Sequence, residues 1–70
     1  MPHRHPKSML FPDSILSAHH DGEGWCIRAE RLGEEPFHFG CYAATAKDAH
    51  WAACEVAKPI GATVAPLRLH

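Results

Sequence analysis

The dipeptide Asp21-Gly22 constrains the fold of this chain more than any other feature. Both positions tolerate the positive φ angles that a two-residue β-hairpin turn requires, and apolar residues alternate with polar ones on either side. The turn would set the following pairs: His20 with Glu23, Ala18 with Trp25, Leu16 with Ile27, and Ser14 with Ala29. The apolar residues of both strands then share one face, so the sequence predicts a hairpin here.

A third strand is predicted after the segment 32–36, which contains Gly and Pro. A five-residue loop at this point turns Phe37, Phe39 and Cys41 toward the apolar face of the first hairpin. A two-residue turn would instead place Cys26 opposite Cys41 and expose both phenylalanines. Burying two phenylalanines contributes about 3–6 kcal/mol, so the longer loop is favoured and a disulfide between the two cysteines is disfavoured. The predicted pairs are Ala29 with Phe39 and Ile27 with Cys41.

A helix is predicted from Thr45, which can cap it, to about Lys58. Asp48 would lie in the first turn, near the positive end of the helix dipole. The spacing of small apolar residues indicates one face that packs on a sheet. That face comprises Ala49, Ala52, Ala53 and Val56. A last strand over 63–69 contains Pro66, which cannot donate to a ladder, so this strand is expected at a sheet edge.

The predicted order is therefore β-β-β-α-β, an α+β fold. A three-stranded antiparallel meander carries one helix on one face, and a C-terminal edge strand follows. Residues 14–70 form a single small domain, since 70 residues leave room for only one core. Residues 1–13 hold three of the six prolines and are expected to be a flexible N-terminal arm, in which 9–11 could anchor on the domain.

Charge and composition exclude several classes of protein. Seven Lys and Arg against eight Asp and Glu give no basic excess, which disfavours nucleic-acid binding. The chain contains no apolar run long enough for a membrane span and no signal peptide, so we expect a cytoplasmic protein with no membrane partner. Three cysteines without a CxxC pair are expected to be reduced thiols.

The middle of the chain, from 21 to 64, resembles several families of short uncharacterised bacterial proteins of unknown function. The matching residues are Gly24-Trp25, Thr45, Asp48-Ala49, Ala53 and Gly61-Ala62. The shared pattern is a Gly-Trp strand, a Thr-x-x-acid-Ala helix start and a Gly-Ala before the last strand. The resemblance implies the fold and carries over no functional residue.

The face of the sheet turned away from the helix is either a plainly solvated surface or an interaction surface, because one helix covers only one face. Eight residues should lie there: Ile15, Ser17, His19, Cys26, Arg28, Glu30, His38 and Tyr42. Among these, Arg28, His38 and Tyr42 are candidate partner-binding residues, since Arg and Tyr are favoured at interfaces. Trp51, expected on the outward side of the helix, is the fourth, unless it covers the edge of the sheet or packs on residues 9–11. Homodimerisation through the same sheet face is a second reading.

A zinc site with four ligands, one of them His38, is an alternative. His38 and Cys41 on a strand, with His50 and Cys54 one helical turn apart, could supply tetrahedral ligands. Strand alternation points His38 and Cys41 to opposite faces unless Gly40 allows a bulge. The plain interpretation of Cys41 is a small core residue, and no cofactor is expected.

The sequence gives little support for catalysis. His50 and Cys54 are the one nucleophile–base pair, and no orienting group accompanies them. We therefore expect a small non-catalytic protein-binding or regulatory module. Nucleic-acid binding through the sheet face is an alternative, because the shape also resembles the three-stranded DNA-binding domains at the N-termini of tyrosine recombinases. A zinc-stabilised module is the other alternative.

Overall fold

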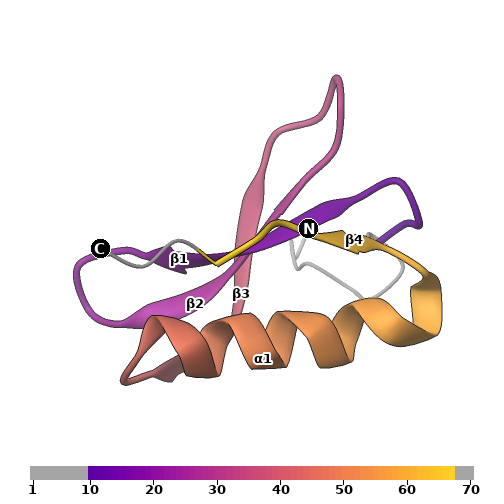
Figure 1. Cartoon of the computed structure of the whole chain (residues 1–70). Coiled ribbons are helices and arrows are strands. Elements are labelled where there is room, and N and C mark those ends of the chain that lie inside the picture. The colour runs from indigo at the N-terminus through magenta and orange to yellow at the C-terminus, as the bar shows by residue number, and fades with distance from the viewer. Residues whose placement is uncertain (1–9, 68–70) are drawn as a thin grey trace.

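The structure, a computed structural model, describes residues 10–67, without the side chain of Cys41. It has the predicted α+β architecture, with one helix packed on one face of a four-stranded sheet (Figure 1). The sheet order is β3-β2-β1-β4. The elements are β1 (Ile15–His20), β2 (Trp25–Glu30), β3 (Phe37–Ala43), α1 (Ala46–Ala57), the 3-10 helix η2 (Lys58–Ile60) and β4 (Thr63–Val64).

The first hairpin forms where it was predicted, but its loop has four residues, 21–24, in place of two. Leu16 therefore faces Ala29, and His20 faces Trp25, a shift of two positions from the predicted register. The loop is longer because Oδ1 of Asp21 accepts a hydrogen bond from the Glu23 amide at 3.0 Å, as Asp side chains do in turns. A shift of two leaves every side chain on its predicted face.

The second hairpin is also shifted by two residues. Ala29 faces Phe37 and Ile27 faces Phe39, and the connecting segment is 31–36. The ladder is then interrupted by a bulge, and Gly40 within it has a φ of +96°. Glycine adopts this angle without the steric cost that a Cβ imposes. The ladder resumes at the pair of Trp25 with Ala43.

Helix α1 begins as predicted. Thr45 is the N-cap, and its hydroxyl accepts a hydrogen bond from the Asp48 amide at 3.2 Å. The helix passes into η2 and ends at Gly61, whose φ is +71°.

Of the predicted last strand 63–69, residues 68 and 69 lie outside the described residues, and the described part is shorter than predicted. β4 contains only Thr63 and Val64, and it pairs with β1 in parallel at the sheet edge. Helix α1 carries the chain back along the sheet, so β4 starts at the same end as β1 (Figure 1). Pro66 follows two residues later and cannot donate to a ladder.

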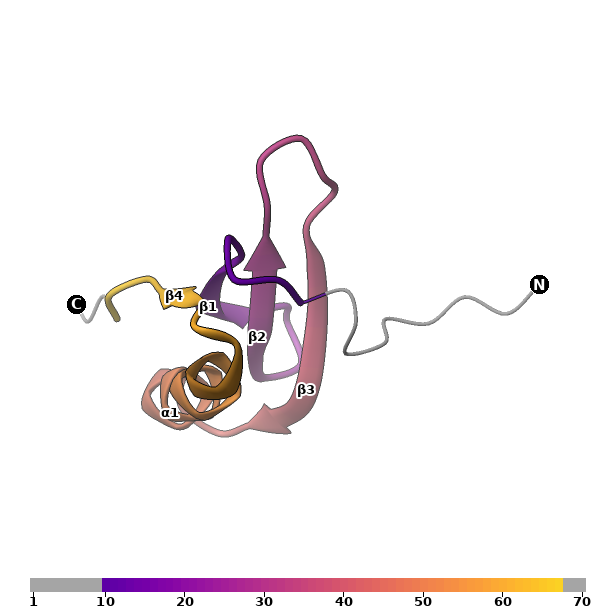
Figure 2. The same cartoon turned by 90° about the vertical axis from the view of Figure 1, so that its right-hand side faces the viewer.

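The helix covers only part of the sheet. The buried core cluster lies where α1 crosses β1 and β2: Leu16, Ile27, Ala29, Ala53 and Ala57. Cys26, predicted on the outer sheet face, is also buried. Seen along its axis in Figure 2, α1 lies beneath β1 and away from β3. A helix is about 10 Å across and strands are about 4.8 Å apart, so one helix shields about two strands. Phe37 and Phe39 on β3 consequently remain half-buried.

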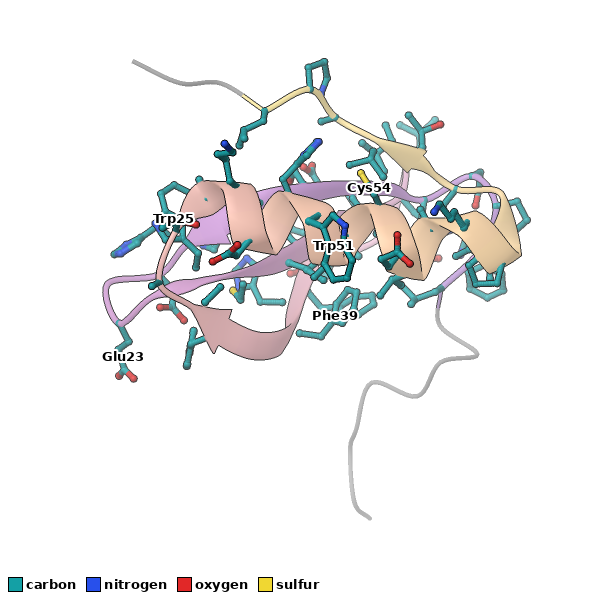
Figure 3. The ribbon with its side chains drawn as sticks, turned by 60° about the horizontal axis from the view of Figure 1, so that its bottom comes forward. Glu23, Trp25, Phe39, Trp51 and Cys54 are labelled. Atoms are coloured by element: carbon teal, nitrogen blue, oxygen red, sulfur yellow. The ribbon has the colours of Figure 1, made fainter. Side chains whose placement is uncertain are left out.

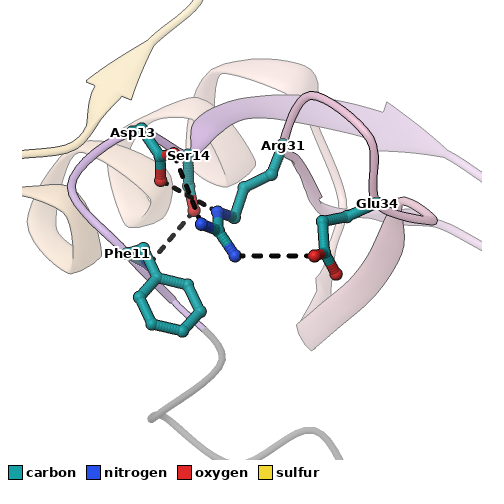
Figure 4. A network of polar contacts seen from close by, with 5 residues as sticks. All are labelled: Phe11, Asp13, Ser14, Arg31 and Glu34. Atoms are coloured by element: carbon teal, nitrogen blue, oxygen red, sulfur yellow. Dashed lines mark hydrogen bonds and ion pairs between the residues drawn. The ribbon is translucent and has the colours of Figure 1, made fainter.

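The last four residues of the predicted arm lie against the domain. Arg31 binds Oδ1 of Asp13 through its Nε at 2.9 Å, and its Nη1 lies 3.9 Å from Glu34 (Figure 4). The same guanidinium stacks 4.1 Å from the centre of the Phe11 ring. Ser14 is buried, and its hydroxyl accepts a hydrogen bond from the Phe11 amide at 3.1 Å. These contacts join the start of the described chain to the β2–β3 loop.

Candidate functional site

The four predicted partner-binding residues lie on two sides of the molecule. Arg28, His38 and Tyr42 are on the sheet face turned away from the helix or at its end, as expected. Trp51 is on the outward side of α1 and is 66% exposed. The two groups are separated by the sheet and the helix, so they do not form one surface.

The centre of the outer sheet face is a pair of stacked histidines. The His19 and His38 rings lie 4.1 Å apart, at an angle of only 9°, and reach over β2 from the two flanking strands. Partial desolvation lowers the pKa of His19, and the nearby charges of His38 and Arg28 lower it further. Arg28 itself pairs with Glu30 at 3.2 Å. The pKa of His19 therefore lies below the ordinary value of a histidine.

Tyr42 is fixed beside the first hairpin loop. Its hydroxyl donates a 2.5 Å hydrogen bond to Oδ2 of Asp21, and its Cβ lies against the backbone of Gly24. The bond raises the pKa of Tyr42 to about 12 and lowers the pKa of the Asp21 carboxyl. The hydroxyl of Tyr42 therefore already has a partner within the domain.

The residues proposed as zinc ligands are divided by the sheet. His50 and Cys54 do meet on α1, with 3.7 Å between Nε2 and Sγ. His38 is in the stack on the opposite sheet face, and the Cys41 side chain lies outside the described residues. Among the residues that the structure describes, no group of three or more His, Cys, Asp or Glu side chains is placed to hold a metal ion.

The pair of His50 and Cys54 shows one further feature. Nδ1 of His50 is buried and has no hydrogen-bond partner among the described residues. The thiol of Cys54 is half-buried beside it. A nucleophile needs a base that a third group orients, and this imidazole has none in the described chain.

A wide hollow lies between α1 and β3. It is a groove with a volume of about 550 Å³. Its lining comprises Leu10, Ile27, Phe37, Phe39, Gly40, Ala52, Val56, Pro59 and Ile60. Figure 3 looks onto the helix and shows Phe39 to one side of α1, with Cys54 toward the other side. We call this site the α1–β3 groove.

The edges of the α1–β3 groove are acidic. Asp48 and Glu55 lie four positions before and three after Ala52, which helical spacing places on the groove side of α1. Glu34 and Glu35 line a smaller hollow that shares Phe37 with the groove, together with Glu30 and with Arg31, which pairs with Glu34 at 3.9 Å. Lys58 pairs with Glu55 at 3.1 Å, whereas Asp48 and Glu35 have no ion pair in the described chain. Negative charge therefore predominates around an apolar interior.

Sequence reasoning missed this groove because it assigned Phe37, Phe39, Ala52 and Val56 to a closed core. The side of the sheet on which these residues lie was predicted correctly. The sheet is wider than one helix can cover, however, so the core does not close over them. Two details could have indicated the groove. The helix presents only small residues to the sheet, and an adjacent bulky residue, Trp51, points outward (Figure 3).

Comparison with protein-family models, characterised proteins and solved structures finds no match for this chain. No helix in the described part of the chain has the length and apolar character needed to cross a membrane. The observations that bear on function are therefore those of the fold and the groove. They define a four-stranded α+β domain with a half-covered sheet.

Proposed function

We propose that this chain is a small non-catalytic protein-binding module, acting in the cytoplasm, and that it binds its partner in the α1–β3 groove. The observation that carries the proposal is the open apolar half of the sheet. Phe37 and Phe39 remain half-buried on a domain that has few large residues to bury. Removing apolar surface from water contributes about 25 cal/mol per Å², so a partner that covers these rings gains affinity.

The lining of the groove favours a protein over a small molecule. Sites for small ligands combine apolar walls with a few polar groups that fix the orientation of the ligand. The nine lining side chains of the α1–β3 groove are all apolar or, at Gly40, absent. An apolar centre with charged residues at its rim is typical of protein interfaces. Trp51, exposed one position before Ala52, adds a residue type that is frequent in binding hot spots.

The test compares capture of proteins from host-cell lysate by three forms of the chain. Ala52→Glu places a charge in the groove, and Ala44→Glu makes the same change at an exposed position before the helix. Arg28→Ala alters the outer sheet face instead. We expect Ala52→Glu to reduce capture of a specific partner by at least about tenfold, because a charge would be buried unpaired.

Ala44→Glu and Arg28→Ala should capture that partner like the unaltered chain. Circular dichroism would verify that each variant is folded. Undiminished capture by a folded Ala52→Glu variant would contradict the proposal. Loss on Arg28→Ala alone would move the binding site to the outer sheet face.

A further inference from the structure

We infer that the α1–β3 groove receives an amphipathic α-helix of a partner protein, with an apolar stripe flanked by Lys or Arg. The inference deepens the proposed function and rests on it. It comes from the width of the sheet, the shape of the groove floor and the charge of the groove edges. Each of these three features favours one kind of partner segment over the others that could cover an apolar groove.

The width of the sheet leaves room for one further helix. Four strands span about 14 Å between the outer strand axes, and neighbouring helices pack about 8–10 Å apart. Helix α1 takes the β1–β2 side, where Leu16, Ile27 and Ala29 are at most 3% exposed. The half-buried Phe37 and Phe39 then lie where a second helix would rest, beside α1 and on β3.

The shape of the groove also favours a helix over an added strand. A strand added to the β3 edge would lie in the plane of the sheet, about 4.8 Å beyond β3. The groove instead lies above the sheet, between Ala52 and Val56 on one wall and Phe39 on the floor. Ala52 and Gly40 have little or no side chain, which lets another backbone approach closely.

The charge of the groove edges selects the polar residues of the partner. Asp48 has no ion pair in the described chain and lies on the groove side of α1, and Glu35, also without one, lines the adjoining hollow that shares Phe37 with the groove. Lys or Arg residues flanking an apolar stripe would lie over these carboxylates. Complementary charge of this kind raises association rates and selects partners more than it adds affinity.

The experiment uses four synthetic peptides of about 14 residues, which is about 21 Å of helix. The first combines Leu at helical spacing with Lys elsewhere. The second replaces Lys with Glu, the third alternates Leu and Lys as a strand would, and the fourth scrambles the first. Each is titrated into the full-length isotope-labelled chain, and the amide signals of Gly40, Ala52 and Val56 are followed by NMR.

We expect the Leu/Lys helical peptide to bind, to shift these amides and to gain helicity in circular dichroism. The Leu/Glu peptide should bind roughly fivefold more weakly, since exposed charge contacts contribute modestly. The strand and scrambled peptides should bind at least about tenfold more weakly, since neither presents a continuous apolar stripe to the groove. Ala52→Glu should abolish binding of the helical peptide, whereas Ala44→Glu should leave it unchanged.

A second pair of variants isolates the charge. Asp48→Asn with Glu35→Gln should remove the preference for Lys over Glu peptides, whereas Glu23→Gln, in the first hairpin loop, should not. An equal affinity for both helical peptides in the unaltered chain would contradict the basic character of the partner.

Three further outcomes would overturn the inference. Tighter binding of the strand peptide would assign the groove to an extended segment. Binding of no peptide, with Ala52→Glu still abolishing capture of a partner from lysate, would reject the helix and leave the proposed function standing. A dimer in sedimentation that Ala52→Glu converts to a monomer would show that a second copy of this chain covers the groove.

Discussion

At the scale of single residues, hydrogen bonds and ring stacking control how this chain titrates. The bond between Tyr42 and Asp21 couples a phenol to a carboxylate, and each shifts the pKa of the other. Partial desolvation, with the neighbouring charges of His38 and Arg28, lowers the pKa of His19, whose ring stacks on that of His38. Both features lie outside the α1–β3 groove, so they can be tested without altering it.

The single tyrosine of the chain makes the first prediction simple to measure. The phenol of Tyr42 should ionise with a pKa of about 12, followed by its ultraviolet absorbance. Asp21→Asn removes the negative charge that opposes ionisation and should return the pKa toward the ordinary value of about 10. Because the folded-state pKa is raised, the stabilisation from this bond is present below pH 10 and is lost as pH rises toward 12. An unchanged titration in Asp21→Asn would show that the bond does not form.

The second prediction concerns acid. The pKa of His19 is lowered in the folded chain, so its contribution to stability is present above about pH 6.5 and is lost as the pH falls through the folded-state value. His38→Phe keeps a ring in the stack but removes a positive charge. The NMR titration of His19 should therefore move upward, and the urea midpoint should fall less between pH 7 and pH 5.

At the scale of elements, local capping fixes where the helix begins, and turns fix the loops. Thr45 satisfies the Asp48 amide, which no helical carbonyl can reach. Asp21 enlarges the first loop, and Gly40 permits the bulge in β3. The capping residue was predictable because its partner is three residues away. The loop lengths were not, because registers that differ by two residues place the same side chains on the same face.

The third prediction follows from the cap. Thr45→Ala should lower the free energy of unfolding by about 1 kcal/mol, because the Asp48 amide loses its acceptor. Thr45→Ser, which keeps a hydroxyl at the cap, should lie within about 0.5 kcal/mol of the unaltered chain. Urea unfolding followed by circular dichroism measures both. Equal losses in the two variants would show that the hydroxyl is not the stabilising group.

At the scale of the whole molecule, one helix on four strands leaves a closed half and an open half. Ala53 is 0% exposed at the closed contact with the sheet, whereas its neighbour Ala52 lines the groove. Two alanines adjacent in sequence therefore have opposite tolerance for a larger side chain. A larger side chain at these two positions should therefore change the free energy of unfolding differently if the groove is open.

The fourth prediction uses this pair. Ala53→Leu should lower the free energy of unfolding by about 1–3 kcal/mol, because the added atoms have no space in a packed contact. Ala52→Leu should be neutral or stabilising, because the leucine extends into the groove and covers apolar surface. Urea unfolding of both variants compares them directly. A large loss in Ala52→Leu would mean that the groove is closed in solution.

The sequence by itself determined the order of elements, the face of each strand residue in the first hairpin and the cap of the helix. These follow from local periods, two in a strand and 3.6 in a helix, and from contacts a few residues apart. Only the tertiary structure decided the registers, the parallel placement of β4, the stack of His19 on His38 and the separation of Trp51 from Arg28. It also decided that α1 lies toward β1 and leaves β3 open. Such features depend on how whole elements dock, and docking is set by the widths and twist of the elements, which no local pattern records.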